Sequence, residues 1–366
     1  MTASYVRSQV LGFRVRAQQL DRPTGRLADT ALLDLGVQDS GVDGARWAMA
    51  NRGISADEAA GDDLATVWTL RGAPHVYRRR DLPSVAAAVE PFSDVDAGRR
   101  IFDASKPLRE AGIGNLEALD TVASAIRRIV TAPMRKGDVS ARLTDVLDPP
   151  YLRFCRPCNA THVYEMTFRL AALRAGVELE AGTSPPVLRP LTGFEPAAAP
   201  GEQHDVVRAY LRLLGPATHQ HVADYLDAPV KDVRARWPSD VVEAAVMGER
   251  RWALAADVAA LEAGPPRLTR LLGPFDLFLQ ARDRRLLTED RARAKQLWPT
   301  LGRPGAVLVD GEVSGTWRPR KSGKKLQVRV ELWIRASRAV RTSIEKQAQR
   351  LADHRKAALS GVEYAD

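Results

Sequence analysis

The sequence predicts a helix-rich α+β protein in which winged-helix units precede a C-terminal domain of β-strands. Two observations predict this fold. A helix–turn–helix pattern occurs twice, around Pro133 and around Pro216, and short apolar runs joined by tight turns fill residues 306–333. Both patterns are recurrent supersecondary units with sequence signatures. The chain has 366 residues, enough for two to four such modules.

The two helix–turn–helix copies share one pattern. In each, an apolar helix ends just before the proline and a polar turn follows; an apolar residue then lies six positions after the proline and a leucine ten positions after it. The leading helices are amphipathic, which favours packing against a core. Their apolar stripes are Leu119, Val122, Ile126, Ile129 and Val130, and Val206, Tyr210, Leu211 and Leu214.

After the second copy, a further helix is expected at 230–237 and an alternating hairpin at 241–254, with its turn at Gly248-Glu249. Three helices and a hairpin make a winged helix. Helix–turn–helix packing is also common in purely architectural bundles, and this alternative remains open for either copy taken alone.

The N-terminal third follows a similar order with weaker signals. Helices are expected at 6–21, at 29–36, where a glycine ends the helix, and at 44–52. A strand-like run at 65–80 turns at Arg71-Gly72.

Linkers rich in proline, glycine or alanine are expected at 91–98, 181–200 and 263–266. They divide the chain into four predicted domains. These are residues 1–92, 93–200, 201–262 and 263–366.

The last of these domains is predicted to be built from hairpins. A strand at 306–309 is followed by Asp310-Gly311, a strong signal for a tight hairpin turn. A basic loop is expected at 318–325, then an alternating strand at 326–333 and a charged amphipathic helix at 336–359. Trp317 and Trp333 are expected in the core, with base stacking as the less favoured alternative.

Positive charge is concentrated in this C-terminal domain. Residues 282–341 contain 16 Lys or Arg and 6 Asp or Glu, a net charge of +10, whereas the whole chain carries +9. A basic face on a folded domain points to a polyanion, most plausibly nucleic acid, although a solvated arginine-rich surface is the alternative. The candidate phosphate-binding residues are Arg282, Arg284, Arg285, Arg318, Arg320, Lys321, Lys324 and Lys325. Asp283 is equally able to bind an arginine in a bidentate pair.

Composition and motifs exclude several classes of protein. No apolar run is long enough to cross a membrane, and Arg7, Arg14 and Arg16 interrupt any signal-peptide core. The two cysteines make no disulfide framework, so we expect a cytoplasmic protein. Gly-rich phosphate loops and the HExxH, GxSxG and EF-hand patterns are missing from the sequence.

Four segments resemble the AlkZ/YcaQ-type winged-helix DNA glycosylases. They are Ala65 to His75, Gly215 to Thr218, Leu271 to Arg284 and Val307 to Trp317. The resemblance implies three tandem winged helices, in the first three predicted domains, arranged as a C around duplex DNA and closed by a C-terminal β-barrel-like domain with a terminal helix. It also implies excision of alkylated purines, or unhooking of interstrand crosslinks, without metal or cofactor. We expect a monomer whose partner is double-stranded DNA.

The family's catalytic signature is a glutamine, one further residue, and then glutamine or aspartate. Gln38 aligns with the first glutamine, Ser40 stands where the second side chain should be, and Asp39 is acidic but one position early. Gln38 would then stabilise charge on the sugar, while Asp39 or Ser40 positions a water molecule. The alternative is that 38–43 is only the turn before the helix at 44–52, with Ser40 or Asp43 as its N-cap.

His75 belongs to the family-like segment at 65–75, and the resemblance implies contact with DNA or with the flipped nucleotide. A histidine satisfied inside a wing is an equal alternative.

Cys155, Cys158 and His162 have the spacing of half a zinc site. A structural zinc ion needs four ligands and only three are local, so we expect no metal and plain buried thiols. A redox pair is the other functional reading, but no thioredoxin-like βαβ pattern surrounds it.

The sequence therefore supports three hypotheses. The first is a monofunctional DNA glycosylase with Gln38 in its site. The second is a non-catalytic tandem winged-helix DNA-binding protein, either a regulator or a repair accessory. The third and weakest is an adaptor whose winged helices bind protein.

Overall fold

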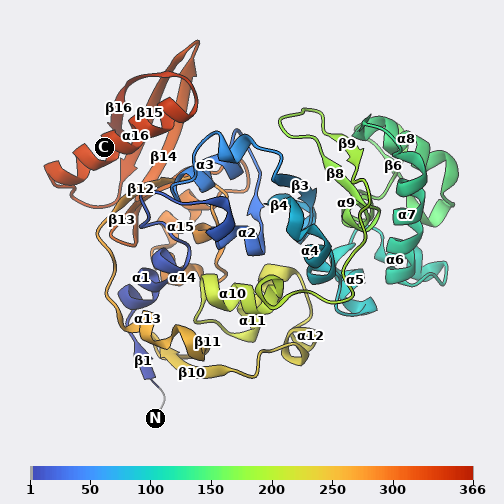
Figure 1. Ribbon diagram of the computed structural model, residues 1–366, viewed down its shortest axis with the longest axis horizontal. Helices are drawn as coiled ribbons and strands as arrows, with labels where there is room; N and C mark the ends of the chain where they lie inside the picture. The colour runs from blue at the N-terminus through green and yellow to red at the C-terminus, as the bar shows by residue number, and fades with distance from the viewer. Residues whose placement is uncertain (1–2, 366) are drawn as a thin grey trace.

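The computed structural model describes residues 3–365, which form a mixed α+β fold of helices around four separate β-sheets (Figure 1). Within this described part, no helix combines the length and the apolar character needed to span a bilayer. The order of elements follows the sequence prediction closely in the two helix–turn–helix regions and less closely at the C-terminus.

The N-terminal region contains the three predicted helices, each shorter than expected. The predicted hairpin also forms, with its turn at Leu70–Gly72, where Arg71 has a positive φ of 57°. The elements are β1 (Ala3–Tyr5), α1 (Arg7–Ala17), α2 (Leu32–Leu35), β2 (Val37–Gln38), α3 (Gly44–Ala50), β3 (Leu64–Trp68), β4 (Pro74–Arg78) and α4 (Leu82–Val89).

The second region supplies the long helix of the first repeat and two β-hairpins. Val139 and Leu143, six and ten residues after the proline, are fully buried as the repeat predicts. The elements are α5 (Asp94–Arg100), α6 (Ser105–Glu110), α7 (Asn115–Ile129), β5 (Met134–Arg135), α8 (Lys136–Val146), β6 (Leu152–Cys155), β7 (Ala160–Val163), α9 (Glu165–Arg174), β8 (Val177–Leu179) and β9 (Val187–Pro190).

The third region has the predicted order of three helices and a hairpin. Its turn lies at Met247-Gly248, one residue earlier than predicted, because both residues adopt positive φ. The elements are α10 (Val206–Leu214), α11 (His219–Leu226), α12 (Val230–Ala235), β10 (Val241–Val246), β11 (Glu249–Leu254) and α13 (Val258–Glu262). The number of winged-helix domains in the chain stays a prediction.

The C-terminal sheet corrects three predictions. It is open, in the order β12-β13-β14-β15-β16, so it does not close into a barrel. The expected basic loop is a continuation of β14 and β15, because Ser322 pairs with Lys325 across a two-residue turn. The terminal helix ends at His354, and the chain returns as a strand parallel to β15. The elements are β12 (Thr269–Leu272), α14 (Arg284–Leu287), α15 (Arg291–Leu297), β13 (Gly305–Val309), β14 (Glu312–Ser322), β15 (Lys325–Leu332), α16 (Arg338–His354) and β16 (Ala358–Ala365).

The apolar cores join regions that are distant in the sequence. One cluster combines Leu33 of α2 with Tyr210 of α10, and another combines Leu11 of α1 with Phe278 and Leu308. A six-stranded sheet, in the order β2-β4-β3-β8-β9-β5, runs from the first region into the second. These regions therefore pack as one assembly, and the predicted domain limits stay a prediction.

Residues 271–284 form a central strut to which several regions attach. Leu271 carbonyl accepts hydrogen bonds from Trp47 Nε1 (2.7 Å) and Asn51 Nδ2 (3.1 Å). Arg52 forms a bidentate pair with Asp276 at 2.6 and 2.9 Å, and both side chains are fully buried. The strut thereby fixes α3 against the C-terminal region.

The far end of the strut is held by a second buried ion cluster. Asp283 accepts hydrogen bonds from Arg14 of α1 at 3.0 and 2.7 Å, and also from Arg251 of β11. One carboxylate thus connects the N-terminal helix, the third region and the C-terminal region. The predicted bidentate role of Asp283 is confirmed, with arginines distant in the sequence.

We expect Asp283→Ala to lower the free energy of unfolding by about 3–5 kcal/mol, because it leaves Arg14 buried without a counter-charge and removes one of the two carboxylates that pair with Arg251. Urea denaturation measures the loss, with Glu289→Ala, an exposed neighbour on the same segment, as the control. Equal stability of the two variants would show that the cluster does not hold the regions together.

Candidate functional site

The candidate site begins at a turn that requires glycine. Gly36 ends α2 with a φ of 91°, and a side chain here would collide with the ring of Tyr77. The Tyr77 hydroxyl lies beneath the turn and donates to the carbonyl of Leu35 at 3.2 Å. The chain therefore leaves α2 in one fixed direction and enters β2.

Pairing between β2 and β4 sets the orientation of Gln38. Val37 lies opposite Val76 and is buried in the core, whereas Gln38 lies opposite His75 on the other face of the pair. The side-chain amide of Gln38 is half-buried and donates from Nε2 to Ser40 Oγ at 2.9 Å. Gln38 and Ser40 are therefore in contact. Their catalytic roles stay a prediction.

Asp39 points away from this pair. Its amide donates to the Pro74 carbonyl at 2.8 Å, and its Oδ1 accepts from the backbone N–H of Ala45 at 3.0 Å. Asp39 therefore supplies the side-chain hydrogen bond at the start of α3. Asp43 occupies the N-cap position, as one of the two predicted candidates, but its side chain makes no capping hydrogen bond. It pairs instead with two guanidinium nitrogens of Arg355 at 3.0 Å, which ties the loop to the end of α16.

His75 lies beneath the surface rather than on it. Its ring is 1% exposed, and its Nδ1 lies 3.0 Å from both Thr69 Oγ1 and the Ala73 carbonyl. Burial, together with the nearby charge of Arg71, lowers the pKa of His75 to about 3, so the ring is neutral at pH 7. Nε2 is buried and finds no hydrogen-bond partner within residues 3–365. Contact of His75 with DNA stays a prediction.

Two grooves flank the loop at 39–44. One, of about 640 Å³, lies between Asp39 and the β8–β9 connection near Thr183. The other, of about 730 Å³, lies between Ser40 and the C-terminal region, where Phe275, Arg303 and Arg318 line it. The loop therefore separates two grooves. Asp39 lines the first and Ser40 lines the second, whereas Gln38 lies at the start of the loop and lines neither.

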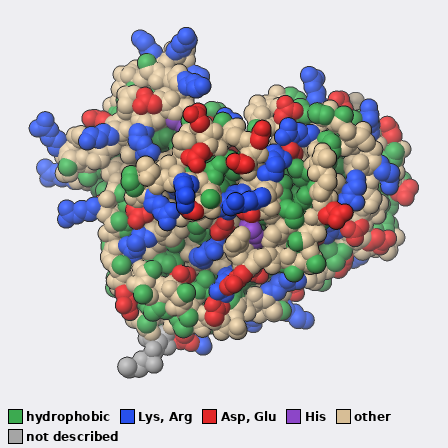
Figure 2. Space-filling view, in the orientation of Figure 1, with side chains coloured by type: hydrophobic (Ala, Val, Ile, Leu, Met, Phe, Trp, Pro, Cys, Tyr) green, Lys and Arg blue, Asp and Glu red, His purple; other side chains and the backbone are tan. Residues whose placement is uncertain are grey.

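The basic residues of the β14–β15 hairpin all reach solvent. Arg318, Arg320, Lys321, Lys324 and Lys325 are exposed, and Figure 2 shows cations at the tip of the lobe that Figure 1 labels β15 and β16. Arg318 also donates to the Gly302 carbonyl at 2.7 Å, at the edge of the larger groove. Arg318 thus lies at the candidate site, and the other four cations lie farther along the hairpin toward its tip.

The three arginines around Asp283 differ in their accessibility. Arg285 is exposed, and Arg284 is exposed and lies over the ring of Trp298, 4.8 Å from its centre. Burial and the nearby charge of Arg71 lower the pKa of Arg282, whose buried Nε has no partner among residues 3–365. Arg284 and Arg285 are therefore better placed than Arg282 to contact a phosphate.

The expectation for the two tryptophans is confirmed, and the expectation for the two cysteines is wrong. Trp317 is buried in the C-terminal core, as predicted, and Trp333 packs against a neighbouring core cluster. Cys158 is exposed and Cys155 half-buried, so the expectation of plain buried thiols is wrong. With His162 they form one cluster.

Thr69, Tyr77 and Arg355 also support the site, although none of them was among the candidate residues. Tyr77 alternates with His75 on β4, and its hydroxyl lies 3.0 Å from Thr69 Oγ1, so strand periodicity indicated this contact. Arg355 lies more than 300 residues from Asp43, and no local signal indicated that pair.

We expect the neutral, buried His75 to make the fold sensitive to acid. Because its pKa falls from 6.5 to about 3 on folding, the unfolded chain binds an extra proton below pH 6.5. The contribution of His75 to the free energy of unfolding should be complete above pH 6.5 and fall by up to about 1.4 kcal/mol per pH unit between pH 6 and 4. Urea denaturation at several pH values in this range measures the free energy of unfolding, which should depend less steeply on pH in His75→Gln than in the wild type. An equal pH dependence in the two proteins would contradict the assignment.

Comparisons with known proteins agree with this arrangement. The family model for AlkZ-like DNA glycosylases matches residues 36–354. A search of curated proteins found no match. The structure of Streptomyces sahachiroi DNA glycosylase AlkZ aligns over 100% of both chains with a TM-score of 0.74 at 20% identity, which shows a shared fold. The chain therefore belongs to the AlkZ-like DNA glycosylase family.

Proposed function

We propose that the protein is a monofunctional DNA glycosylase that removes alkylated purines from duplex DNA, with Gln38 at the reaction centre. The observation that carries the proposal is the amide of Gln38, held by Ser40 at the start of a loop that separates two grooves, one of which is also lined by Arg318 of the basic hairpin. Membership of the family supports a role in DNA repair. Unhooking of interstrand crosslinks is an extension of the same chemistry, because that step also cleaves a bond from sugar to alkylated base.

The chemistry explains why an amide can serve. An N3- or N7-alkylated purine is already cationic, so the C1′–N bond can break without protonation of the base, and its electron pair neutralises the purine. Positive charge then develops on the sugar, and water adds to C1′ and loses a proton. Glycoside hydrolases use two carboxylates for such steps. A preorganised amide oxygen provides a weaker form of the same stabilisation.

The local geometry fits this role for Gln38. Its Nε2 is engaged with Ser40, which orients the amide and leaves Oε1 without a partner among the described residues. The neutral state of His75, opposite Gln38 in the sheet, keeps a positive charge away from the sugar. Asp39 has one oxygen on the N–H of Ala45, and its other oxygen is available to accept the proton of the attacking water.

DNA affinity would come from the cations around this site. Phosphate contacts hold a duplex without reading its sequence. We further propose that the protein acts as a monomer in the cytoplasm.

A non-catalytic DNA-binding role is the second candidate, and two observations favour it. Ser40 stands where the family has glutamine or aspartate, and Asp39 is engaged in capping α3. Such a protein would bind duplex DNA and release no base.

We expect the affinity for duplex DNA to fall steeply with salt, with log K declining by about 0.9 per phosphate contacted for each unit of log salt. Combined Ala substitution of Arg318, Arg320, Lys321, Lys324 and Lys325 should flatten this slope, measured by fluorescence anisotropy. Ala substitution of Arg99, Lys106 and Arg109, exposed cations on α5 and α6, is the control. An unchanged slope in the hairpin variant would remove the hairpin from the interface.

We expect Gln38→Ala to slow base release by about 10²-fold or more, the scale for loss of one charge-stabilising group. Single-turnover release of N7-alkylguanine and N3-alkyladenine from duplexes measures this, and affinity and folding should remain near wild type. Gln349→Ala, an exposed glutamine on α16, is the control. Equal rates for Gln38→Ala and wild type would refute the assignment. A wild type that releases none of these bases would favour the non-catalytic role.

Asp39→Asn separates two functions of one side chain. The asparagine oxygen can still accept from Ala45, so α3 remains capped, while the proton acceptor is lost. We expect base release to slow and the melting temperature to change little. A normal rate would indicate that Ser40, and not Asp39, positions the attacking water. Base release by Ser40→Ala would then test that role.

A further inference from the structure

The hairpin β6–β7 stands apart from the proposed DNA chemistry. It pairs only with itself, as a two-stranded sheet, and lies among the helices of the second region, far from β2 and α3 in Figure 1. Residues 156–161 at its end are all exposed. Such a hairpin buries little apolar surface and is at best marginally stable by itself. A ligand bound at the exposed end would therefore add to the stability of the hairpin.

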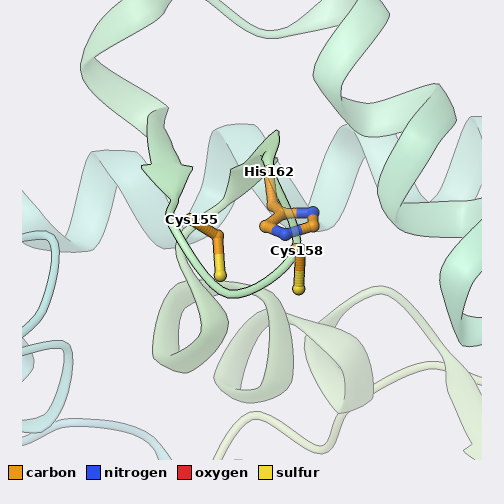
Figure 3. Close-up of side chains that lie close together, drawn as sticks. All are labelled: Cys155, Cys158 and His162. Carbon is orange, nitrogen blue, oxygen red and sulfur yellow. The ribbon is translucent and has the colours of Figure 1, made fainter.

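Strand register places two metal-binding side chains on one face of this hairpin. Cys155 pairs with Ala160 and Arg153 pairs with His162, so Cys155 and His162 are diagonal neighbours on the same face. The turn then returns Cys158 to that side, and Figure 3 shows both sulfur atoms and the imidazole ring gathered there. The ligand atoms of the three residues all lie within 4.8 Å of one another.

These separations are close to those of a tetrahedral zinc site. Bonds of about 2.3 Å to sulfur and 2.0–2.1 Å to nitrogen put neighbouring ligand atoms roughly 3.5–4 Å apart. A small closure of the exposed turn is enough to reach that spacing.

A redox pair fits this setting less well. Reactive Cys-x-x-Cys pairs occur at helix N-termini, whereas here both cysteines flank a hairpin turn. The positive charge of the neighbouring Arg153 does not prevent binding of Zn²⁺, because the two thiolates neutralise the charge of the ion.

We propose that Cys155, Cys158 and His162 bind one Zn²⁺ ion, with water as the fourth ligand, and that this ion holds the end of the β6–β7 hairpin. Binding displaces the two thiol protons and moves no electrons. The three local side chains are one fewer than a closed structural site has, so the proposed site has the three-ligand set with one open position that zinc also adopts in proteins. The inference is independent of glycosylase activity.

Metal content tests the proposal directly. The full chain, purified in reducing buffer without chelator, should contain one zinc ion per chain by plasma mass spectrometry. Replacement by Co²⁺ should produce thiolate-to-cobalt charge-transfer absorption, which can arise only here because the chain has two cysteines. Cys155→Ser and Cys158→Ser should abolish this absorption, and His162→Ala should weaken Co²⁺ binding. Thr161→Ala, the exposed neighbour on the opposite face, should leave it unchanged.

A second measurement does not depend on any variant. Chelation of the wild-type metal should increase amide hydrogen exchange in 152–163 and leave α7 and the C-terminal sheet protected. The proposal fails if the reduced chain contains no zinc and gives no charge-transfer absorption with Co²⁺. It also fails if the two cysteines form a disulfide and the reduced form binds neither metal.

Discussion

The strut at 271–284 is the constraint on which the rest of the structure depends. Within one short segment it receives Trp47, Asn51 and Arg52 from α3 and the residues that follow it, and its two aspartates bind three buried arginines. Buried charges are costly unless they are paired, so each arginine accepts only one arrangement of its neighbours. The N-terminal helix, α3, the third region and the C-terminal sheet are therefore fixed relative to one another.

The position of the candidate site follows from this strut. The loop at 36–44 runs into α3, and α3 is bound to the strut at its far end. Glycine at position 36, the Asp39 cap and the Asp43–Arg355 pair then fix the loop along its length. Fixed dipoles stabilise developing charge because they need no reorganisation during the reaction. An amide dipole can therefore take the place of a carboxylate only if the loop that carries it is rigid. The buried, neutral His75 adds no positive charge that would oppose the charge developing on the sugar.

Local patterns predicted much of this fold. Periodicity indicated α7, α10 and the hairpin β10–β11, and Asp310-Gly311 indicated the turn between β13 and β14. The errors arose where distant contacts decide the outcome. The terminal helix was expected to continue to residue 359 and no strand was expected after it, because the pairing of β16 with β15 is invisible to local periodicity. For the same reason, the sequence placed Asp43 among the candidates for the N-cap of α3 but did not indicate that Asp39 supplies the side-chain hydrogen bond from across the loop. Gln38 and Ser40 were singled out by the family resemblance, which did not indicate the hydrogen bond between them.

The central claim is that the amide of Gln38 stabilises positive charge on the deoxyribose. The most direct measurement compares duplexes that carry a cationic pyrrolidine or a neutral tetrahydrofuran in place of the target nucleoside. Wild type should bind the cationic duplex more tightly than the neutral one, and Gln38→Ala should lose most of this preference while it binds the neutral duplex normally. The same preference in both proteins would contradict the account.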